Sequence, residues 1–474
     1  MKKLIFNYAS FVINNPLIIL ASVFLIILIA SKGITNFKLD ASSDALVLEG
    51  DASLKTFREN EKEFGDSSFL IVTFKPFNEL FSYQSLDQIS QIEKSLLKLD
   101  GVDSVLSILD APIFFQPKVS LTEVADNLKD LTTEGIDLNL AKEEIINNPI
   151  YRDLIISKDG STTALQVVLR GNDEYDLLID ERYRVLDTLK SKEPITFENK
   201  KLLLNELDRI NKRISKLNDN ESKFNASLVS EIRSILDIHR NSATMYLGGP
   251  AMITSDMMEY IRSDLVIFGL AVASVFAIML YLFFGNIWFV ILPISNAFLT
   301  TFVTAGFLGF MDWKISVVSS NFIALLLILT ISLTVHVLVK INELTKKSIS
   351  QKESLIEAVD QMFLPCFFSA ITTAVAFLSL LLGDLKPVIE FGKMMAFGIF
   401  IAFIFTFSFL PSALTLSKKM ISRDFLSLHK ITTSILYFSK NNSLKLYISF
   451  TALFCLLILG TTKLVVENRF IDYF

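Results

Sequence analysis

Residues 265–311 read LVIFGLAVASVFAIMLYLFFGNIWFVILPISNAFLTTFVTAGFLGFM, a stretch of 47 residues without one charged side chain. A helix needs about 20 apolar residues to cross the hydrocarbon core of a bilayer. The stretch is therefore too long for one crossing and suits two, with a turn at Gly285-Asn286. Because a spanning segment must satisfy its backbone hydrogen bonds internally, we expect both crossings to be α-helices.

Further uncharged stretches lie on both sides of this one. The first, between Lys3 and Lys32, contains 28 uncharged residues. Its basic start resembles a signal peptide, but Ala30-Ser31-Lys32-Gly33 is a poor cleavage site, so we expect an uncleaved helix. The sequence predicts seven transmembrane helices: helix 1 within 1–32, helices 2–6 within 265–417 and, after a connector at 418–445, helix 7 at 446–463.

The charges of the chain are concentrated in one block. Residues 33–264 carry 40 Asp and Glu and 27 Lys and Arg, a net charge of −13, whereas the whole chain has a net charge of −5. Overall, 51% of the residues are hydrophobic. This composition excludes a soluble globular enzyme and a disordered protein. It also excludes nucleic acid as a partner, because nucleic-acid binding needs a basic face.

The basic residues predict the orientation in the membrane. If the N-terminus is cytoplasmic, twelve Lys and Arg lie in the N-terminus and in the loops 340–360 and 418–445, and three lie in the opposite loops 312–314 and 384–393. The positive-inside rule favours this arrangement. We therefore expect a multi-pass protein of the inner (cytoplasmic) membrane with residues 33–264 on the periplasmic or extracytoplasmic side. Residues 340–360 are expected to form an amphipathic helix along the inner surface.

The block 33–264 has the patterns of an α+β domain. A strand, a helix and a strand at 68–75, 83–99 and 102–108 make a β-α-β unit. Asp159-Gly160 predicts the turn of a β-hairpin. The remaining elements are that hairpin at 151–170, a helix at 175–190 and a strand at 244–247.

Residues 198–240 contain two runs of apolar residues with helical spacing. The first run steps by four and three from Leu203 to Leu217, and the second extends from Phe224 to Ile235. Asn218-Asp219-Asn220 separates them, which predicts a helical hairpin insertion with a coiled-coil-like seam. Two interpretations stay open: an element that packs on the domain, or a docking arm for another chain or protomer.

A short pattern occurs twice in the chain. Asn36-Phe37-Lys38-Leu39-Asp40 follows the first apolar helix, and Asn468-Arg469-Phe470-Ile471-Asp472 follows the seventh. Both read Asn-x-x-aliphatic-Asp. The repetition predicts that residues 464–474 begin a second copy of the whole unit.

The order of these segments and several local motifs are similar to those of one transporter family. The motifs are Asp40, Asp44, Phe57 and Phe64-Gly65 after helix 1, Gly248-Gly249-Pro250 and Asp264 before helix 2, Ile371–Ala374 with Phe377–Leu380 in helix 5, and Phe391-Gly392, Gly398 and Leu410-Pro411 in helix 6. The chain resembles the resistance–nodulation–cell division (RND) superfamily, in its MMPL-like exporter branch. It looks like the N-terminal half of such a protein with the first helix of the second half.

The resemblance implies a fold and an activity. It implies an α-helical membrane protein whose extracytoplasmic α+β domain has ferredoxin-like porter subdomains. It implies export of lipids or other hydrophobic or amphiphilic substrates, driven by the proton-motive force. Full members have two halves, so the implied partners are membrane lipids, the substrate, and a second transporter half or a homo-oligomer.

In this family the fourth helix commonly carries an acidic residue that relays protons. Here Ser332 stands at that position, and residues 315–339 contain no carboxylate. A serine cannot titrate, whereas His336 can titrate near neutral pH. Three interpretations stay open. Ser332, Thr334 and His336 form a modified relay, the relay lies in the other half, or these groups only form hydrogen bonds between helices.

Other polar residues in the apolar helices are further candidates, because such residues are costly in a membrane. Asn321 is predicted deep in the fourth helix. Thr372 and Thr373 in the fifth helix either bond to their own helix backbone or face the fourth helix. The sequence shows no metal-ligand cluster, no phosphate-binding loop and no nucleophile–base motif. We therefore expect no enzymatic activity, no cofactor and no metal.

Three functions are compatible with these features. The first is an RND-type secondary exporter of lipids or other amphiphiles. The second is a non-transporting lipid-binding or scaffold protein on the same fold, which the missing carboxylate allows. The third is an accessory subunit of Sec-type protein export, a group with a similar six-helix layout. Sec accessory subunits also rely on an acidic residue in the fourth helix, so this third function ranks last.

Overall fold

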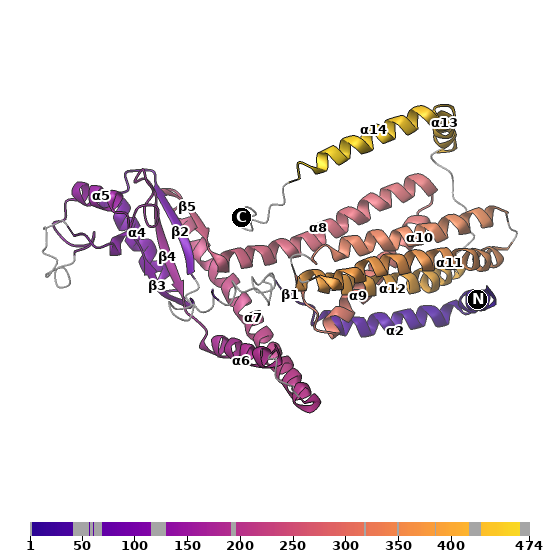
Figure 1. Cartoon of the computed structure of the whole chain (residues 1–474), viewed down its shortest axis with the longest axis horizontal. Coiled ribbons are helices and arrows are strands. Elements are labelled where there is room, and N and C mark those ends of the chain that lie inside the picture. Colours follow the sequence, from indigo (N-terminus) through magenta and orange to yellow (C-terminus); the bar gives the residue numbers. More distant parts are fainter. Residues whose placement is uncertain are drawn as a thin grey trace.

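The chain forms a long helical bundle at one end and a smaller α+β domain, here called the sheet domain, at the other (Figure 1). Seven helices in the described part of the chain are long and apolar enough to cross a membrane, as predicted. The fold class expected from the sequence is thus confirmed. The computed structural model describes residues 2–40, 56, 60, 69–114, 129–190, 196–316, 319–347, 350–383, 385–416 and 428–464.

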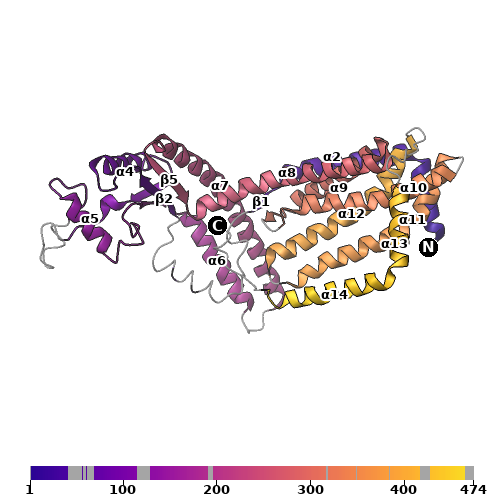
Figure 2. The ribbon, with the colours of Figure 1, turned by 90° about the horizontal axis from the view of Figure 1, so that it is seen from above.

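The bundle is built from long apolar helices that lie side by side (Figures 1 and 2). Gly285, in the left-handed conformation with φ of 59°, ends one helix and allows the turn expected at Gly285-Asn286. The spanning helices are α2 (Pro16–Ile34), α8 (Pro250–Phe284), α9 (Trp288–Phe310), α10 (Phe322–Lys347), α11 (Gln351–Leu378) with the 3-10 turn η3 (Ser379–Leu382), α12 (Lys386–Leu416) and α14 (Ser443–Thr461).

The first predicted helix is in fact two helices. α1 (Lys2–Asn14) ends before Asn15, and α2 begins at Pro16. Proline disfavours helical backbone in the residue before it and has no amide hydrogen to donate, so it begins a helix more readily than it continues one. α1 packs across α11 and α12 and buries Ala9 and Ile13. Only α2 is therefore long and apolar enough to span.

The predicted surface helix at 340–360 is also wrong. α10 continues to Lys347, and α11 begins at Gln351. The apolar residues of this region lie on the core-facing sides of two long helices, where Leu355 and Val359 are buried. In its described part, the connector predicted at 418–445 contains α13 (Leu428–Asn441) and the first three residues of α14.

The sheet domain is a four-stranded antiparallel sheet with the strand order β3-β4-β2-β5. Its elements follow the chain as β-α-β-β-α-β, with three further helices between the strands in the part that the structure describes. They are β2 (Phe69–Pro76), α4 (Tyr83–Leu96), β3 (Val102–Leu106), η2 (Ile108–Asp110), α5 (Leu138–Asn147), β4 (Thr163–Leu169), α6 (Asp173–Lys190), α7 (Phe197–His239) and β5 (Ala243–Gly248).

The core of the sheet domain follows from alternation along the strands. Leu70, Val72 and Phe74 of β2 are fully buried, and they join one cluster with Ile89 of α4 and Ile232 of α7. The strands predicted at 68–75, 102–108 and 244–247 and the helices predicted at 83–99 and 175–190 are present. Of the hairpin expected at 151–170, only the second strand, β4, is regular. The segment before it forms only isolated bridges in its described residues.

α7 is one continuous helix of 43 residues, so the predicted helical hairpin at 198–240 is wrong. The apolar stripe passes through Asn218-Asp219-Asn220 in phase, because Leu217 and Phe224 are seven residues, or about two turns, apart. The N-terminal half of α7 pairs instead with α6, where Leu178 and Val185 pack against Ile210 and Ile214. We call α6 and residues 197–219 of α7 the arm.

Two short strands lie where the bundle meets the sheet domain. β1 (Leu39–Asp40), which follows α2, pairs in parallel with β6 (Ile315–Ser316), which precedes α10. Leu39 is opposite Ile315, and the Ile315 amide donates to the Lys38 carbonyl at 3.0 Å. This pair ties the ends of α2 and α10 together. The repeated Asn-x-x-aliphatic-Asp pattern at 468–472 lies outside the described residues.

Candidate functional site

The interior of the bundle contains a cluster of uncharged polar side chains between α9, α10 and α12. The Asn296 Nδ2 group donates to Thr334 Oγ1 at 2.9 Å and to Thr406 Oγ1 at 3.0 Å. All three side chains are fully buried. One amide on α9 therefore connects two neighbouring helices through hydrogen bonds that water does not reach.

The hydroxyl groups of this cluster are oriented by their own helices. Thr334 Oγ1 donates to the Thr330 carbonyl at 2.7 Å, and Thr300 Oγ1 donates to the Asn296 carbonyl at 2.8 Å. Since Thr334 uses its hydrogen in this way, its oxygen is left to accept from Asn296. Among the described residues, Asn296 Oδ1 and Thr330 Oγ1 are buried without a hydrogen-bond partner. Such groups are costly, so the cluster has unused capacity for a hydrogen bond.

The chemistry open to this cluster is limited by its residue types. Asparagine and threonine side chains do not titrate at accessible pH, so the cluster can hold helices together but cannot carry a proton as a charge. In the part of the chain that the structure describes, no three His, Cys, Asp or Glu side chains are grouped so as to hold a metal ion.

The three residues predicted in the fourth helix do not form one group. Thr334 belongs to the buried cluster, whereas Ser332 and His336 are exposed. Ser332 and His336 are four residues apart and therefore share one face of α10, next to each other. The structure thus brings Ser332 and His336 together on the surface of the bundle and separates both from Thr334.

The other candidates lie away from the buried cluster. Asn321 is exposed and precedes the first residue of α10, so it is not deep in the span. Thr372 Oγ1 donates to the carbonyls of Phe368 and Ser369, and Thr373 Oγ1 donates to that of Ser369. Of the two interpretations of these threonines, the described contacts favour bonding to their own helix.

Sequence reasoning missed Asn296 and Thr406. Asn296 lies in the uncharged stretch 265–311, whose length alone predicts two helices. The rule that a polar side chain in a span is costly applies to an asparagine as well as to a charged residue. That rule would have selected Asn296, although only the structure shows its partners.

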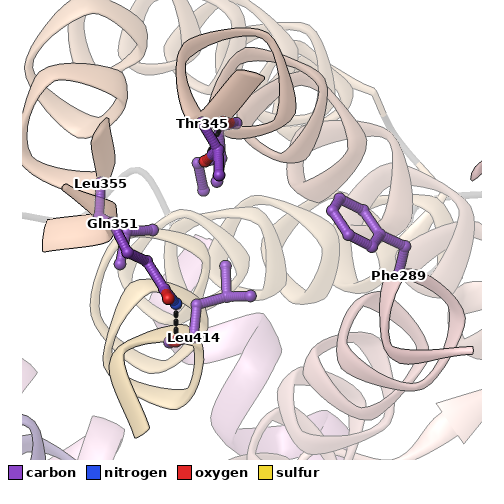
Figure 3. Close-up of a pocket in the computed structure, with 6 residues that line it drawn as sticks. Phe289, Thr345, Gln351, Leu355 and Leu414 are labelled. Atoms are coloured by element: carbon purple, nitrogen blue, oxygen red, sulfur yellow. Dashed lines mark hydrogen bonds between the residues drawn. The ribbon is translucent and has the colours of Figure 1, made fainter. Parts of the chain in front are cut away.

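A small cavity lies between the ends of α9, α10, α11 and α12 that are farthest from the sheet domain (Figure 3). Gln351 borders it and donates from Nε2 to the Leu414 carbonyl at 2.9 Å. The volume of about 10 Å³ suits at most one water molecule. The cavity is therefore no binding site for a lipid. Its lining consists of Phe289, Ile341, Thr345, Gln351, Leu355 and Leu414.

Comparison with known proteins shows which proteins the chain is similar to. Residues 214–432 match the MMPL family, and this range includes Asn296, Thr334 and Thr406. A protein of Methanocaldococcus jannaschii, whose name describes it only as a membrane protein, is 21% identical over 432 residues. That alignment covers 89% of this chain and 96% of the relative. These matches agree with the resemblance seen in the sequence: the chain is similar to membrane proteins of the MMPL family.

Proposed function

We propose that the protein is an RND-type secondary exporter that moves lipids or other hydrophobic or amphiphilic molecules across or out of the inner membrane. The proposal rests on the continuity of α8 between the sheet domain and the bundle. This helix starts at Pro250, directly after β5 of the sheet domain, and continues unbroken for 35 residues to Phe284 in the bundle. A continuous helix can transmit movement between a membrane bundle and a domain outside the membrane. The β-α-β-β-α-β order of the sheet domain also supports the expected porter-like fold.

We propose that protons drive transport and that the titrating carboxylate comes from a second bundle. Within α10 the one carboxylate is Glu343, in the last two turns and paired with Lys340 and Lys347. Ser332 and His336 lie exposed on a membrane-spanning helix, where polar groups are expensive. A second bundle covering this face of α10 would remove that cost and could place its carboxylate beside Ser332.

A repeat in the structure supports the second bundle. α1 and α13 are short helices, and each is followed by a single Asn and a 19-residue apolar helix, α2 or α14. α2 packs against α9 and α12, whereas no residue of α14 is buried. Both views show α14 at the edge of the bundle (Figures 1 and 2). We propose that α14 is the counterpart of α2 in a second transporter half or in a homo-oligomer.

The position of glycine agrees with this repeat. Gly33 and Gly460 are each the eighteenth residue of their 19-residue helix. A side chain added at Gly33 would collide with the Gly306 carbonyl of α9, whereas one added at Gly460 would meet nothing within 4 Å. Gly460 is thus available for the same close helix contact with a partner helix.

The proposed placement follows the basic residues. We propose a cytoplasmic N-terminus and an extracytoplasmic sheet domain, with membrane lipids around the bundle and no enzymatic activity. The test uses inside-out membrane vesicles from cells that express the protein. A fluorescent NBD-phosphatidylethanolamine added to the outer leaflet should become protected from dithionite faster when the lumen is acidified.

Two results would reject the exporter. One is equal protection with and without the pH gradient. The other is protection no faster than in vesicles without the protein. If the probe binds the purified protein but is not moved, the lipid-binding scaffold becomes the better function.

A further inference from the structure

One carboxylate joins the arm to the bundle. The Asp219 side chain on α7 accepts from Lys38 Nζ, which follows α2, at 2.8 Å. It also accepts from Lys314 Nζ, which precedes α10, at 3.1 Å. Asp219 and Lys314 are mostly buried, with 22% and 16% of their side-chain surface exposed. Three segments far apart in the sequence therefore meet at one acidic side chain.

The two lysines are held next to each other by backbone structure. Each directly precedes a residue of the parallel pair Leu39 and Ile315. Both ammonium groups contact the Asp219 carboxylate, so its negative charge offsets part of the repulsion between them, and Asp312 adds a contact to Lys38 at 3.5 Å. Burial alone would raise the pKa of the Asp219 carboxyl, but the hydrogen bonds and charges of both lysines outweigh it and leave that pKa below its usual value.

Asp219 lies on α7 between the part that packs in the sheet domain and the part that belongs to the arm. The C-terminal part of the helix enters the core of the sheet domain through Leu228, Ile232 and Leu236. The N-terminal part packs against α6. Asp219 lies between these parts, so a force applied there acts on both the arm and the sheet domain. In both views α7 passes beside β1, where the arm and the bundle meet (Figures 1 and 2).

The local sequence also indicates a tertiary role for this residue. Asparagine and aspartate are poor helix formers, and three of them follow one another at 218–220 in the middle of a long helix. The contact with the two lysines accounts for Asp219 at this place. By contrast, Asp208 on the same helix is exposed and, among the described residues, forms an ion pair with Lys212, one turn away.

The sheet domain has one continuous helical connection to the bundle, α8. A body attached through a single helix can pivot about it, whereas a second attachment fixes its orientation. We propose that Asp219, Lys38 and Lys314 form a latch that fixes the arm and the sheet domain on the bundle. Through this latch, movement of the joined ends of α2 and α10 is passed to α7. The inference that this movement serves export rests on the proposed function, but the latch itself does not.

The test measures orientation directly. Spin labels at Leu204→Cys on the arm and Met311→Cys at the end of α9 report the arm-to-bundle distance, in a background of Cys366→Ala and Cys455→Ser. Both label sites are exposed. With Asp219 present, we expect one narrow distance population. Asp219→Asn should replace it with a broad distribution, while the matched variant Asp208→Asn should leave it narrow.

A charge exchange separates a specific latch from general damage. Asp219→Lys combined with Lys38→Glu and Lys314→Glu restores opposite charges and should restore the narrow population. An unchanged distribution in Asp219→Asn would overturn the latch. So would a broad distribution that the exchange does not repair. If the distances behave as expected but no lipid is moved by any variant, the latch stands and the proposed exporter fails.

Discussion

Asn296 of α9 donates a hydrogen bond to Thr406 Oγ1 of α12 at 3.0 Å, and both side chains are fully buried. The same amide group donates to Thr334 of α10. Three helices of the bundle are thus joined through one neutral side chain. This buried polar cluster holds helices together, and its neutral side chains cannot carry a proton as a charge.

Replacing Asn296 should therefore reduce stability. Asn296→Ala removes two interhelical hydrogen bonds, each worth about 0.6 kcal/mol on average and up to about 1.7 kcal/mol in membrane proteins. We expect a lower unfolding temperature in detergent. The matched control is Thr373→Ala, whose hydroxyl bonds only to its own helix. Equal unfolding temperatures for these two variants would contradict a role of Asn296 in holding the bundle together.

The paired glycines should respond differently to the same change. Gly33→Leu forces a side chain into the Gly306 carbonyl and should displace α2, which lowers stability strongly. Gly460→Leu meets open space and should leave the stability of the isolated chain unchanged. If α14 contacts a second bundle, Gly460→Leu should also lower the mass of the assembly in native gels. Loss of stability in Gly460→Leu alone, without change in assembly, would argue against the repeat.

Residues of the fourth helix should have mild effects on transport. Thr334→Ala removes the hydrogen bond from Asn296, and Ser332→Ala removes the bond proposed to a carboxylate of the second bundle. Each is worth about 0.6 to 1.7 kcal/mol, so transport should fall only a few-fold. His336→Ala should be mild as well, because His336 is exposed and lies one turn before Lys340, where a polar side chain can snorkel to the membrane surface. Complete loss of transport in His336→Ala, with normal expression, would instead show that His336 relays protons.

The latch has a defined dependence on pH. The pKa of Asp219 is lowered in the folded protein, so its contribution to stability is present above the unfolded pKa of about 3.9 and is lost as the pH falls through the folded pKa. The arm-to-bundle distance distribution should therefore be constant from neutral pH to about pH 5 and broaden below about pH 4. Broadening that is already complete at pH 6 would point to a group other than Asp219.

Membrane orientation can be tested with two equally exposed lysines. Lys158 in the sheet domain is 68% exposed, and Lys347 at the end of α10 is 69% exposed. In the cysteine-free background, an impermeant maleimide applied to intact cells should label Lys158→Cys but not Lys347→Cys. The reverse pattern would place the sheet domain in the cytoplasm. Permeabilised cells, in which both positions should react, provide the control.

The main features of the bundle could be predicted because an uncharged run of about 20 residues that crosses a bilayer must form an α-helix. The errors have local causes. Pro16 divides the first run into α1 and α2, although both pieces are apolar. Asn218-Asp219-Asn220 suggests a helix break because all three are poor helix formers. The two lysines that bind Asp219 are far away in the sequence, so their contact could not be predicted. The helical spacing of the apolar residues, which continues from Leu217 to Phe224, predicts one continuous helix and agrees with α7.

The candidate site could be predicted only in part. Thr334 was selected from its place in the fourth helix, but Ser332 and His336 face away from it. Which side of a helix meets a neighbour depends on packing between segments distant in sequence, so the separation of these residues is visible only in the fold. The partners of Asn296 on α10 and α12 are 38 and 110 residues away.

Proton-driven export is tested most directly by the movement of NBD-phosphatidylethanolamine in inside-out vesicles with and without an acidified lumen. We predict faster protection of the probe from dithionite when the lumen is acidified, and loss of that difference when a protonophore collapses the gradient. The same rates with the gradient, without it and in vesicles lacking the protein would contradict proton-driven export.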